Sequence, residues 1–202
     1  MAGRTPGQRA GLSRERVLDV ALTIADRDGL AGLTMRKLGA ELGVEAMTLY
    51  HHLPNKDALL DGLVERVLEL ATPPETGDWA ASMRGYAIGL RAMLLEHPGV
   101  LPLAATRPAV TPGTLRTVER SLTLLRDAGF PLGLALDLVN ALSVFVIGHV
   151  AAEVAIPTAP PMELDEFPLL AEAVRTGAGV DDADRFHVAV DAFLLGFGQL
   201  SG

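Results

Sequence analysis

Cysteine is absent from this 202-residue chain, and aromatic residues make up only 4% of it. The lack of cysteine excludes disulfide bonds and thiolate metal sites, and it is compatible with a reducing compartment. Signatures of hydrolytic enzymes are missing as well, because the sequence holds neither HExxH nor GxSxG. We therefore predict no enzymatic activity, no catalytic residue, no metal site and no cofactor.

A signal peptide is also lacking. Residues 1–17, MAGRTPGQRAGLSRERV, are polar and basic and have no apolar core, so we expect a cytoplasmic protein. The longest apolar run, residues 132–156, is long enough to raise the question of a membrane span. Charged residues are costly inside a bilayer, and this run contains Asp137 and Glu153. We predict a buried helix of a soluble protein, with no membrane partner.

Positively charged residues are fewer than negatively charged ones, and the balance differs along the chain. Residues 1–56 carry eight Lys or Arg and six Asp or Glu, net +2, whereas residues 57–202 carry nine and nineteen, net −10. A polyanion would be attracted to the first part and repelled by the second. Such asymmetry also arises by chance, so it favours nucleic-acid binding without establishing it.

Strand-like alternation is missing over any useful length, and apolar residues recur at helical spacing instead. The chain is therefore predicted to be all-α. Ser13 and Thr34 are expected to cap the first two helices. Residues 72–78 read as a linker, and residues 97–112 as a short stretch broken by prolines. Helices are predicted over residues 14–28, 35–42, 45–52, 56–71, 79–96, 113–128, 131–156, 162–176 and 183–200.

Residues 34–52 have the pattern of a helix-turn-helix. Gly39 allows two helices to approach closely, and Gly43 permits the positive φ of a tight turn. Four apolar residues are expected to face inward: Leu38, Leu42, Val44 and Leu49. An ordinary helical hairpin shares this pattern, so the spacing alone leaves both interpretations open.

The outward face of the second helix is short, polar and aromatic, which suits a major groove. Lys56 opens the next helix, where its ammonium and the helix N-terminus can both hold a phosphate. The adjacent His51 and His52 also raise the possibility of a metal site. A third ligand would be needed, and the remaining histidines are remote in sequence. We therefore favour DNA contact for His51, and packing or capping of the helix end for His52.

Three motifs together resemble the DNA-binding domain of TetR-family transcriptional repressors. They are TMRKLGAELGV at residues 34–44, TLYHH at 48–52 and NKDALLD at 55–61, and the likeness covers about residues 13–60. A weaker likeness, carried by residues 106–108 (TRP), Gly129-Phe130 and the Ala-rich helix after them, points to the tetracycline repressor subgroup. The resemblance implies a DNA-binding domain with a basic N-terminal arm at residues 1–56. It implies a regulatory, ligand-binding and dimerisation domain at residues 57–202.

The resemblance, read with the outward face of the motif, also implies which side chains meet a double-stranded DNA operator. These are Thr34, Met35, Arg36, Ala46, Met47, Thr48, Tyr50, His51 and Lys56. A homodimer is expected, because a lone helix-turn-helix seldom reads enough DNA. Small residues in the helix 131–156 permit close packing, and we place Phe193 and Phe197 of the last helix in the subunit interface.

The effector is expected to differ from that of the tetracycline repressors, where the drug arrives with magnesium. The three side chains that recognise this chelate in the subgroup fall on Thr72, Leu103 and Ala152, so they are missing. A largely apolar small molecule is predicted instead. Its expected binding residues, each of which is alternatively an ordinary core residue, are Tyr86, Leu90, Leu103, Arg107, Asn140 and Val144.

The sequence thus predicts a ligand-responsive repressor, released from a palindromic operator by a small, mainly apolar effector. The alternative is a helical protein-interaction module, or a small-molecule-binding protein, without DNA binding. Lys56 and the uncharged outward face of residues 45–52 favour the repressor.

Overall fold

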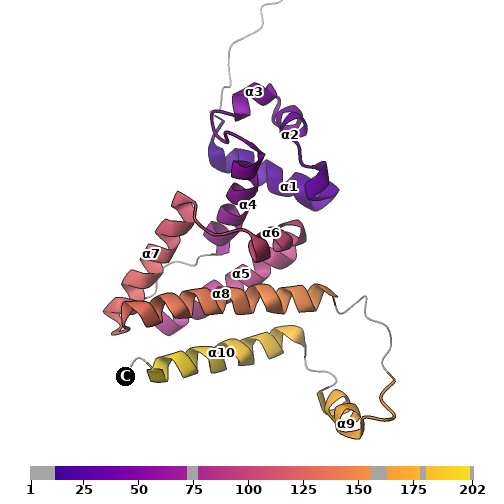
Figure 1. Ribbon diagram of the computed structural model, residues 1–202, viewed down its shortest axis with the longest axis vertical. Helices are drawn as coiled ribbons and strands as arrows, with labels where there is room; N and C mark the ends of the chain where they lie inside the picture. Colours follow the sequence, from indigo (N-terminus) through magenta and orange to yellow (C-terminus); the bar gives the residue numbers. More distant parts are fainter. Residues whose placement is uncertain (1–11, 72–76, 156–162, 178–180, 201–202) are drawn as a thin grey trace, which may run out of the picture. The chain divides into compact units, whose positions relative to one another are not determined.

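The protein is described by a computed structural model, which covers residues 12–71, 77–155, 163–177 and 181–200. Every regular element in these ranges is helical, which confirms the all-α class (Figure 1). The chain divides into two compact units that do not follow sequence order. Unit 1 contains residues 12–66 and 97–111, and unit 2 contains the described residues of 67–96 and 112–200. The functional division expected at residue 56 stays a prediction.

Unit 1 begins with three helices, and the capping residues correctly predicted where the first two start. In α1 (Arg14–Gly32) the Ser13 hydroxyl accepts from the Arg16 amide at 3.2 Å, and in α2 (Met35–Leu42) the Thr34 hydroxyl accepts from the Lys37 amide at 3.1 Å. Gly29, with φ of 71°, interrupts α1 near its end, where the sequence predicted the helix to stop. The third helix, α3 (Ala46–Leu49), is shorter than predicted, because residues 50–52 form a turn.

The core of unit 1 lies between α1 and the start of α4 (Lys56–Ala71). Arg14 on α1 holds the nearly buried carboxylate of Glu65 through two hydrogen bonds of 2.8 and 3.0 Å. Gly62 permits this close packing, because a Cβ there would lie 2.7 Å from the Leu18 side chain. The fully buried side chains from these helices and their neighbours are Val17, Ala21, Leu33, Leu38, Leu49, Leu59 and Leu63.

Residues 97–111 also belong to unit 1, although they follow it by thirty residues of chain. They form η1 (Pro98–Val100), a 3₁₀ turn, and α6 (Leu101–Thr106). The sequence predicted a short stretch broken by prolines, and the structure shows that part of this stretch is helical. Pro98 and Pro102 stand in the first turns of these elements, where proline is tolerated because the N–H it lacks has no helical partner.

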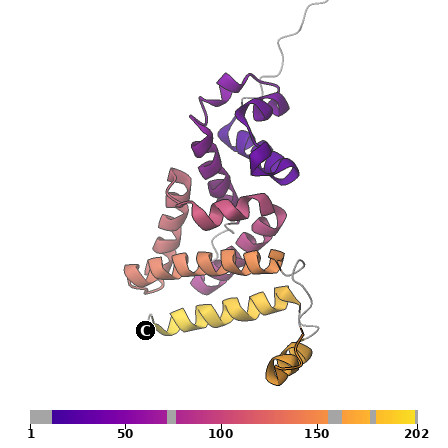
Figure 2. The same cartoon turned by 45° about the vertical axis from the view of Figure 1, so that its right-hand side comes forward.

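Unit 2 packs α5 (Trp79–Glu96), α7 (Pro112–Asp127), α8 (Leu132–Ala155) and α10 (Asp182–Leu200). In Figures 1 and 2, α8 and α10 run side by side. Fully buried residues of α5 and α8, such as Leu90 and Leu138, form the core. The end of α4 meets α5 at Gly89, where a Cβ would collide with the Ala71 carbonyl. The helix α9 (Pro168–Gly177) has no buried residue and begins later than predicted.

The long apolar helix α8 is buried on one face only. By length and composition it could cross a membrane, but one third of its most apolar window is buried against its neighbours. The buried face carries Ala135, Leu138, Leu142, Val146 and Val150. The opposite face leaves Leu136 and Val144 exposed, by 41% and 70%. The prediction of a buried helix therefore holds for one face of α8, and the other face is exposed in the protomer.

Candidate nucleic-acid interface and ligand-binding region

A helix-turn-helix is formed by α2 and α3. Gly43 ends α2 with φ of 68°, and its amide donates to the Ala40 carbonyl at 3.2 Å. Gly39 lets the chain fold back against α2, because a Cβ there would lie 2.8 Å from the Val44 carbonyl oxygen. Both glycines therefore have the roles that the sequence predicted.

Burial of the motif decides which side of α3 is available to a partner. Leu38 and Leu49 are fully buried, while Leu42 and Val44 are half-buried. With Leu49 turned inward, Met47 is 70% exposed and Tyr50 41% exposed. Thr48 and His51 are exposed as well, and Ala46 is half-buried. The predicted groove-facing residues thus lie on the side of α3 that the core does not use.

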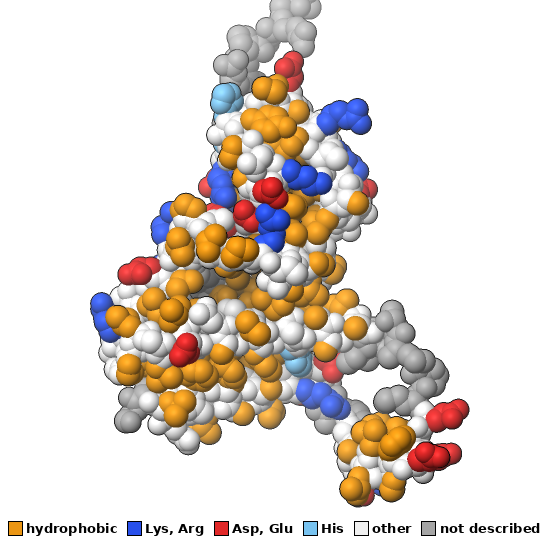
Figure 3. All heavy atoms as spheres, viewed as in Figure 1, with side chains coloured by type: hydrophobic (Ala, Val, Ile, Leu, Met, Phe, Trp, Pro, Cys, Tyr) orange, Lys and Arg blue, Asp and Glu red, His pale blue; other side chains and the backbone are white. Residues whose placement is uncertain are grey.

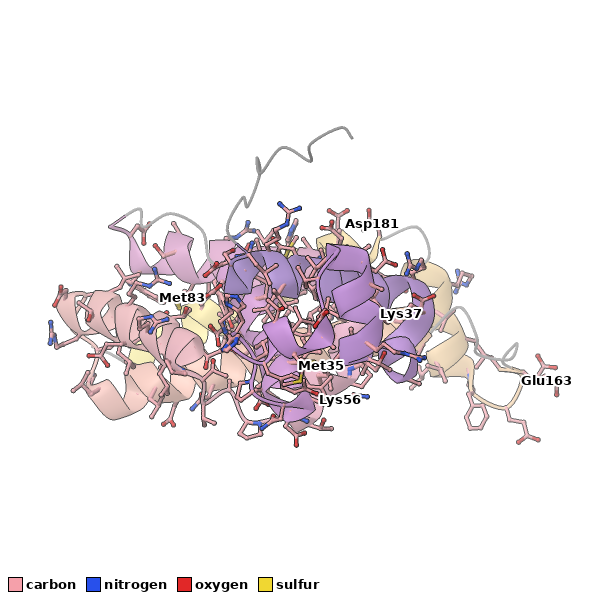
Figure 4. All side chains as sticks on the ribbon, turned by 90° about the horizontal axis from the view of Figure 1, so that it is seen from above. Met35, Lys37, Lys56, Met83, Glu163 and Asp181 are labelled. Carbon is pink, nitrogen blue, oxygen red and sulfur yellow. The ribbon has the colours of Figure 1, made fainter. Side chains whose placement is uncertain are left out.

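The start of α2 adds a second group of predicted DNA-binding residues. Thr34 and Arg36 are exposed, and Met35 is half-buried. Met35 is labelled in Figure 4. The Thr34 hydroxyl is engaged as the cap of α2, so it has one lone pair left for a further donor. This leaves Arg36 as the charged group of α2 that is available to a phosphate.

Most cations of unit 1 are neutralised by carboxylates. Arg16, Arg36 and Lys56 are different: their charged groups are exposed and make no ion pair with any residue in the described part of the chain. Two of these three, Arg36 and Lys56, are predicted DNA-binding residues. The paired cations are Arg14 with Glu65, Arg27 with Asp28 and Glu41, Lys37 with Asp28, Arg66 with Asp19, and Arg107 with Asp57 and Asp61.

Lys56 is the first residue of α4, whose N-terminus is capped by Asn55. The Asn55 side-chain oxygen accepts from the Ala58 amide at 2.8 Å. An exposed ammonium therefore stands beside a helix N-terminus, and the two have the same sign of charge. This arrangement suits a phosphate oxygen.

The histidine pair after α3 is placed differently for each member. His51 is exposed, while His52 is half-buried and its amide donates to the Leu49 carbonyl at 2.9 Å. Because α3 ends at Leu49 with Tyr50 as its C-cap, His52 lies in the turn after the helix and is half-buried there, which agrees with packing rather than capping. In the ranges that the structure describes, no group of three His, Asp or Glu side chains lies close enough together to hold a metal ion.

The segment 97–111 is attached to unit 1 by contacts that the sequence did not predict. His97 Nδ1 lies 2.7 Å from Asp26 Oδ2 of α1, and Gly99 packs on the end of α1 so closely that a Cβ would lie 3.0 Å from the Ala25 carbonyl oxygen. Arg107 Nε donates to Asp61 of α4 at 2.6 Å. Charge complementarity was visible in the sequence, but these partners are separated by 71 and 46 residues.

Only part of the predicted ligand-binding set lies together. In unit 2, Leu90 is fully buried and Tyr86 is half-buried, and the Tyr86 hydroxyl lies 3.0 Å from that of Ser143. Ser143 in turn donates to the Val139 carbonyl at 2.8 Å. Burial raises the pKa of Tyr86, so its hydroxyl stays protonated and can serve as a hydrogen-bond donor.

The other four predicted ligand-binding residues are elsewhere. Asn140 and Val144 lie on the exposed face of α8, and Leu103 and Arg107 belong to unit 1. Of the positions that lack the magnesium-chelate side chains, Leu103 is buried, Ala152 is exposed, and Thr72 lies outside the described residues, like the basic arm of residues 1–11.

Unit 2 also contains an aromatic cluster beside an ion pair, which was not predicted from the sequence. Arg91 of α5 forms two hydrogen bonds with Glu153 of α8, at 2.6 and 3.0 Å, and both side chains are more than 80% buried. The guanidinium lies 5.3 Å from the centre of the Phe186 ring. Phe145 and His149 pack on the same ring, and His149 Nε2 is buried without a hydrogen-bond partner among the described residues.

The predicted interface residues Phe193 and Phe197 are partly inside the protomer. Phe193 stacks on Phe145 of α8 with 6.0 Å between ring centres, and on Phe197 at 5.0 Å. The large apolar side chains that α10 leaves more exposed are Val188, by 70%, Leu195, by 67%, and Leu200, by 66%. Both phenylalanines are half-buried, so their place in the interface stays a prediction, and these more exposed residues are further candidates for it.

A surface cavity of about 380 Å³ lies between the start of α5 and the end of α10. Trp79 forms one wall and packs edge-on against Phe130, with ring centres 4.7 Å apart. The exposed ion pair of Arg84 and Asp191 stands at its rim. None of the six predicted ligand-binding residues lines it.

Comparisons with known proteins cover both parts of the chain. Residues 17–63 match the sequence profile described as "Bacterial regulatory proteins, tetR family", and residues 72–199 match "Tetracyclin repressor-like, C-terminal domain". The chain is 34% identical over 200 residues to tetracycline repressor protein class D of Escherichia coli, which covers 93% of this chain and 90% of that protein.

Solved structures agree with these matches. Apo ActR from Streptomyces coelicolor is similar with a TM-score of 0.76 and 29% identity, over 96% of this chain and 99% of that one. The same protein in complex with actinorhodin gives a TM-score of 0.74 and 28% identity, over 96% and 100%. The likeness therefore extends over nearly the whole of each chain.

Proposed function

The chain belongs to the TetR family of bacterial regulatory proteins, and from this premise we propose that it occupies a palindromic operator as a homodimer and leaves it when a small effector binds. Repression with a helix-turn-helix and a ligand-binding domain is the family's function. The observation that carries the proposal for this chain is the exposed side of α3, flanked by Arg36 and Lys56, which no carboxylate of the described chain neutralises.

We assign the DNA contacts according to the chemistry of each exposed group. Met47 and Thr48 are placed to meet base edges, where an apolar group can contact a thymine methyl and a hydroxyl can bond either kind of edge. Tyr50 and His51, at the end of α3, are assigned to the DNA backbone. Arg36 and Lys56 are assigned to phosphates, which fix position and carry no sequence information. Thr34, Met35 and Ala46 complete the contact surface.

Selection of binding sites from a pool of randomised duplexes tests the assignment. We expect enrichment of an inverted repeat, whose half-sites lie about 34–36 Å apart or at a multiple of that spacing. Thr48→Ala should change the preferred bases of the half-site, while Lys56→Ala should weaken binding to all sequences alike. Recovery of sequences without an inverted repeat would contradict binding as a symmetric dimer.

A second copy of the chain is the partner we propose for the exposed faces of α8 and α10. Apolar side chains gather over these two helices in Figure 3. Val144 on α8 and Val188 and Leu195 on α10 are each about two-thirds exposed or more, an arrangement that favours association. Two such helices from each protomer can build a four-helix interface about a twofold axis.

For the effector we propose a mainly apolar small molecule that binds among the α5 and α8 residues of unit 2. The Tyr86 and Ser143 hydroxyls already bond to each other, so few polar groups are left for a ligand. Leu90 contributes apolar surface beside them. Binding can lower DNA affinity only if the effector prefers the arrangement that does not bind DNA. The continuous helix α4 is the element we assign to this coupling, because it starts in unit 1 and ends in unit 2. As a DNA-binding regulator, the protein is proposed to act in the cytoplasm.

Titration of the purified protein with a panel of apolar small molecules, followed by Trp79 fluorescence, tests the effector assignment. Trp79 is the single tryptophan of the chain and stands at the start of α5. A true effector should change its emission and release the selected duplex over the same concentration range. Emission changes without release of DNA would identify a ligand but not an effector.

A further inference from the structure

Arg107 makes the densest set of polar contacts between the segment 97–111 and the rest of unit 1. Its Nε donates to Asp61 Oδ1 at 2.6 Å, and its Nη2 lies 3.2 Å from Asp57 Oδ1 and 3.4 Å from the Asp57 carbonyl oxygen. One guanidinium therefore engages two carboxylates from the first two turns of α4.

Asp57 stands where negative charge would oppose DNA binding. Asp57 follows Lys56 directly in the first turn of α4, and its side chain is 81% exposed. A bare carboxylate at this place would repel the phosphate that we assign to Lys56. It would also offset the favourable field of the helix N-terminus, which attracts the nearest anion whatever its source.

We propose that Arg107 is a positioning residue of the DNA-binding unit, whose positive charge offsets part of the negative charge of Asp57 and Asp61 and thereby keeps the start of α4 attractive to phosphate. This inference rests on the proposed function, because it needs DNA at Lys56. It removes Arg107 from the predicted ligand-binding residues. It also gives the segment 97–111, which is remote in sequence, a part in DNA binding.

The surroundings of Arg107 fit such a role. Its amide donates to the Leu103 carbonyl at 2.8 Å, which fixes the residue as the end of α6, and Leu103 itself is buried. The hydrogen bond with Asp61 raises the pKa of Arg107, so the guanidinium stays charged. A planar group with several donors can serve two acceptors at once, which a lysine ammonium does with less geometric definition.

The test uses the full-length protein and a fluorescein-labelled duplex of mixed sequence, because repulsion of phosphates is independent of base sequence. At low salt, Arg107→Gln should weaken binding about fivefold, the effect of one charge per protomer acting over several ångströms of water. The loss should shrink below about twofold near 0.3 M salt, where the screening length is shorter. Arg107→Lys, which keeps the charge, should bind within about twofold of wild type.

Charge rescue separates this role from a purely structural one. Adding Asp57→Asn to Arg107→Gln should return affinity to within about twofold of wild type, because the lost positive charge is balanced by a lost negative one. A structural defect would not be repaired by that change. Should Arg107→Gln fail to fold, Asp57→Asn alone decides the matter, since it removes one repelling charge and is expected to tighten binding about twofold at low salt.

Arg84→Gln is the matched control. Arg84 also holds a carboxylate, Asp191 at 2.6 Å, but belongs to unit 2. It should leave DNA affinity nearly unchanged. An equal loss with Arg84→Gln, a loss with Arg107→Gln that is the same at all salt concentrations, or the absence of rescue would each overturn the inference alone. Failure of the wild-type protein to bind DNA at low salt would overturn the proposed function, and the inference with it.

Discussion

Lys56→Ala removes an exposed ammonium from the first residue of α4 without breaking any ion pair of the described chain. If this ammonium holds a phosphate, its loss should lower the dependence of log K on log salt by about 0.9 per contact. A symmetric dimer loses two contacts, so the slope should fall by about 1.8. The same relation predicts that binding at 0.1 M salt becomes about 60-fold weaker.

Lys37→Ala is the natural control for this experiment, because it removes the same charge from the same unit. The Lys37 ammonium is already paired with Asp28 at 2.8 Å, so it is less available to a phosphate than the Lys56 ammonium. We expect its salt slope to stay within about half a unit of wild type. The assay is fluorescence anisotropy with one selected duplex between 50 and 300 mM salt.

Two results would refute the reasoning. An unchanged slope for Lys56→Ala would show that the exposed ammonium does not meet a phosphate. An equal decrease for Lys37→Ala would show that the binding responds to total charge rather than to a cation without a carboxylate partner. In either case the assignment of Arg36 would lose its basis, because it relies on the same observation.

Three further predictions concern unit 2. Leu195→Asp should place a charge in the proposed subunit interface and yield monomers by light scattering. Leu169→Asp on α9, where the leucine is 81% exposed, should leave the dimer intact. A Leu195→Asp protein that remains dimeric would contradict the interface. Arg91→Ala should lower the free energy of unfolding in urea by about 3 kcal/mol, because it leaves the largely buried Glu153 carboxylate without its ion-pair partner. Arg84→Ala, at an exposed pair, should lower it by no more than about 1 kcal/mol. Equal costs would show that burial does not govern these pairs. Tetracycline with magnesium should neither change Trp79 fluorescence nor release DNA, since Leu103 and Ala152 cannot bind a cation; release would contradict the effector proposal.

Local signals were sufficient to predict the helix-turn-helix. Thr34 caps α2, Gly43 turns the chain at positive φ, and Gly39 allows the close approach, each through atoms only a few residues away. Backbone sterics and capping act over this short range, so the sequence specifies them directly. The exposed side of α3 then follows from the burial of Leu49.

Long-range pairings could not be predicted in the same way. The chain has many acidic residues that could pair with Arg107, and only the packing of unit 1 brings Asp57 and Asp61 to it. The sequence also did not show which face of α8 is buried, because both faces are apolar and periodicity cannot distinguish them. The half-buried position of Phe193 has the same origin, since α10 carries large apolar side chains on both sides.

Unit 1 is discontinuous along the chain, and this has a consequence for protein engineering. Gly99 packs on the end of α1, His97 pairs with Asp26 of α1, and Arg107 pairs with carboxylates at the start of α4. Residues 12–66 alone therefore carry surfaces that are shaped for a segment encoded later. On the ribosome this unit cannot be completed before residue 111 has emerged. A chimera that joins residues 1–66 to the regulatory half of another repressor would therefore inherit mismatched partners at these three places. Exchanging residues 97–111 together with the N-terminal part would keep the DNA-binding unit whole.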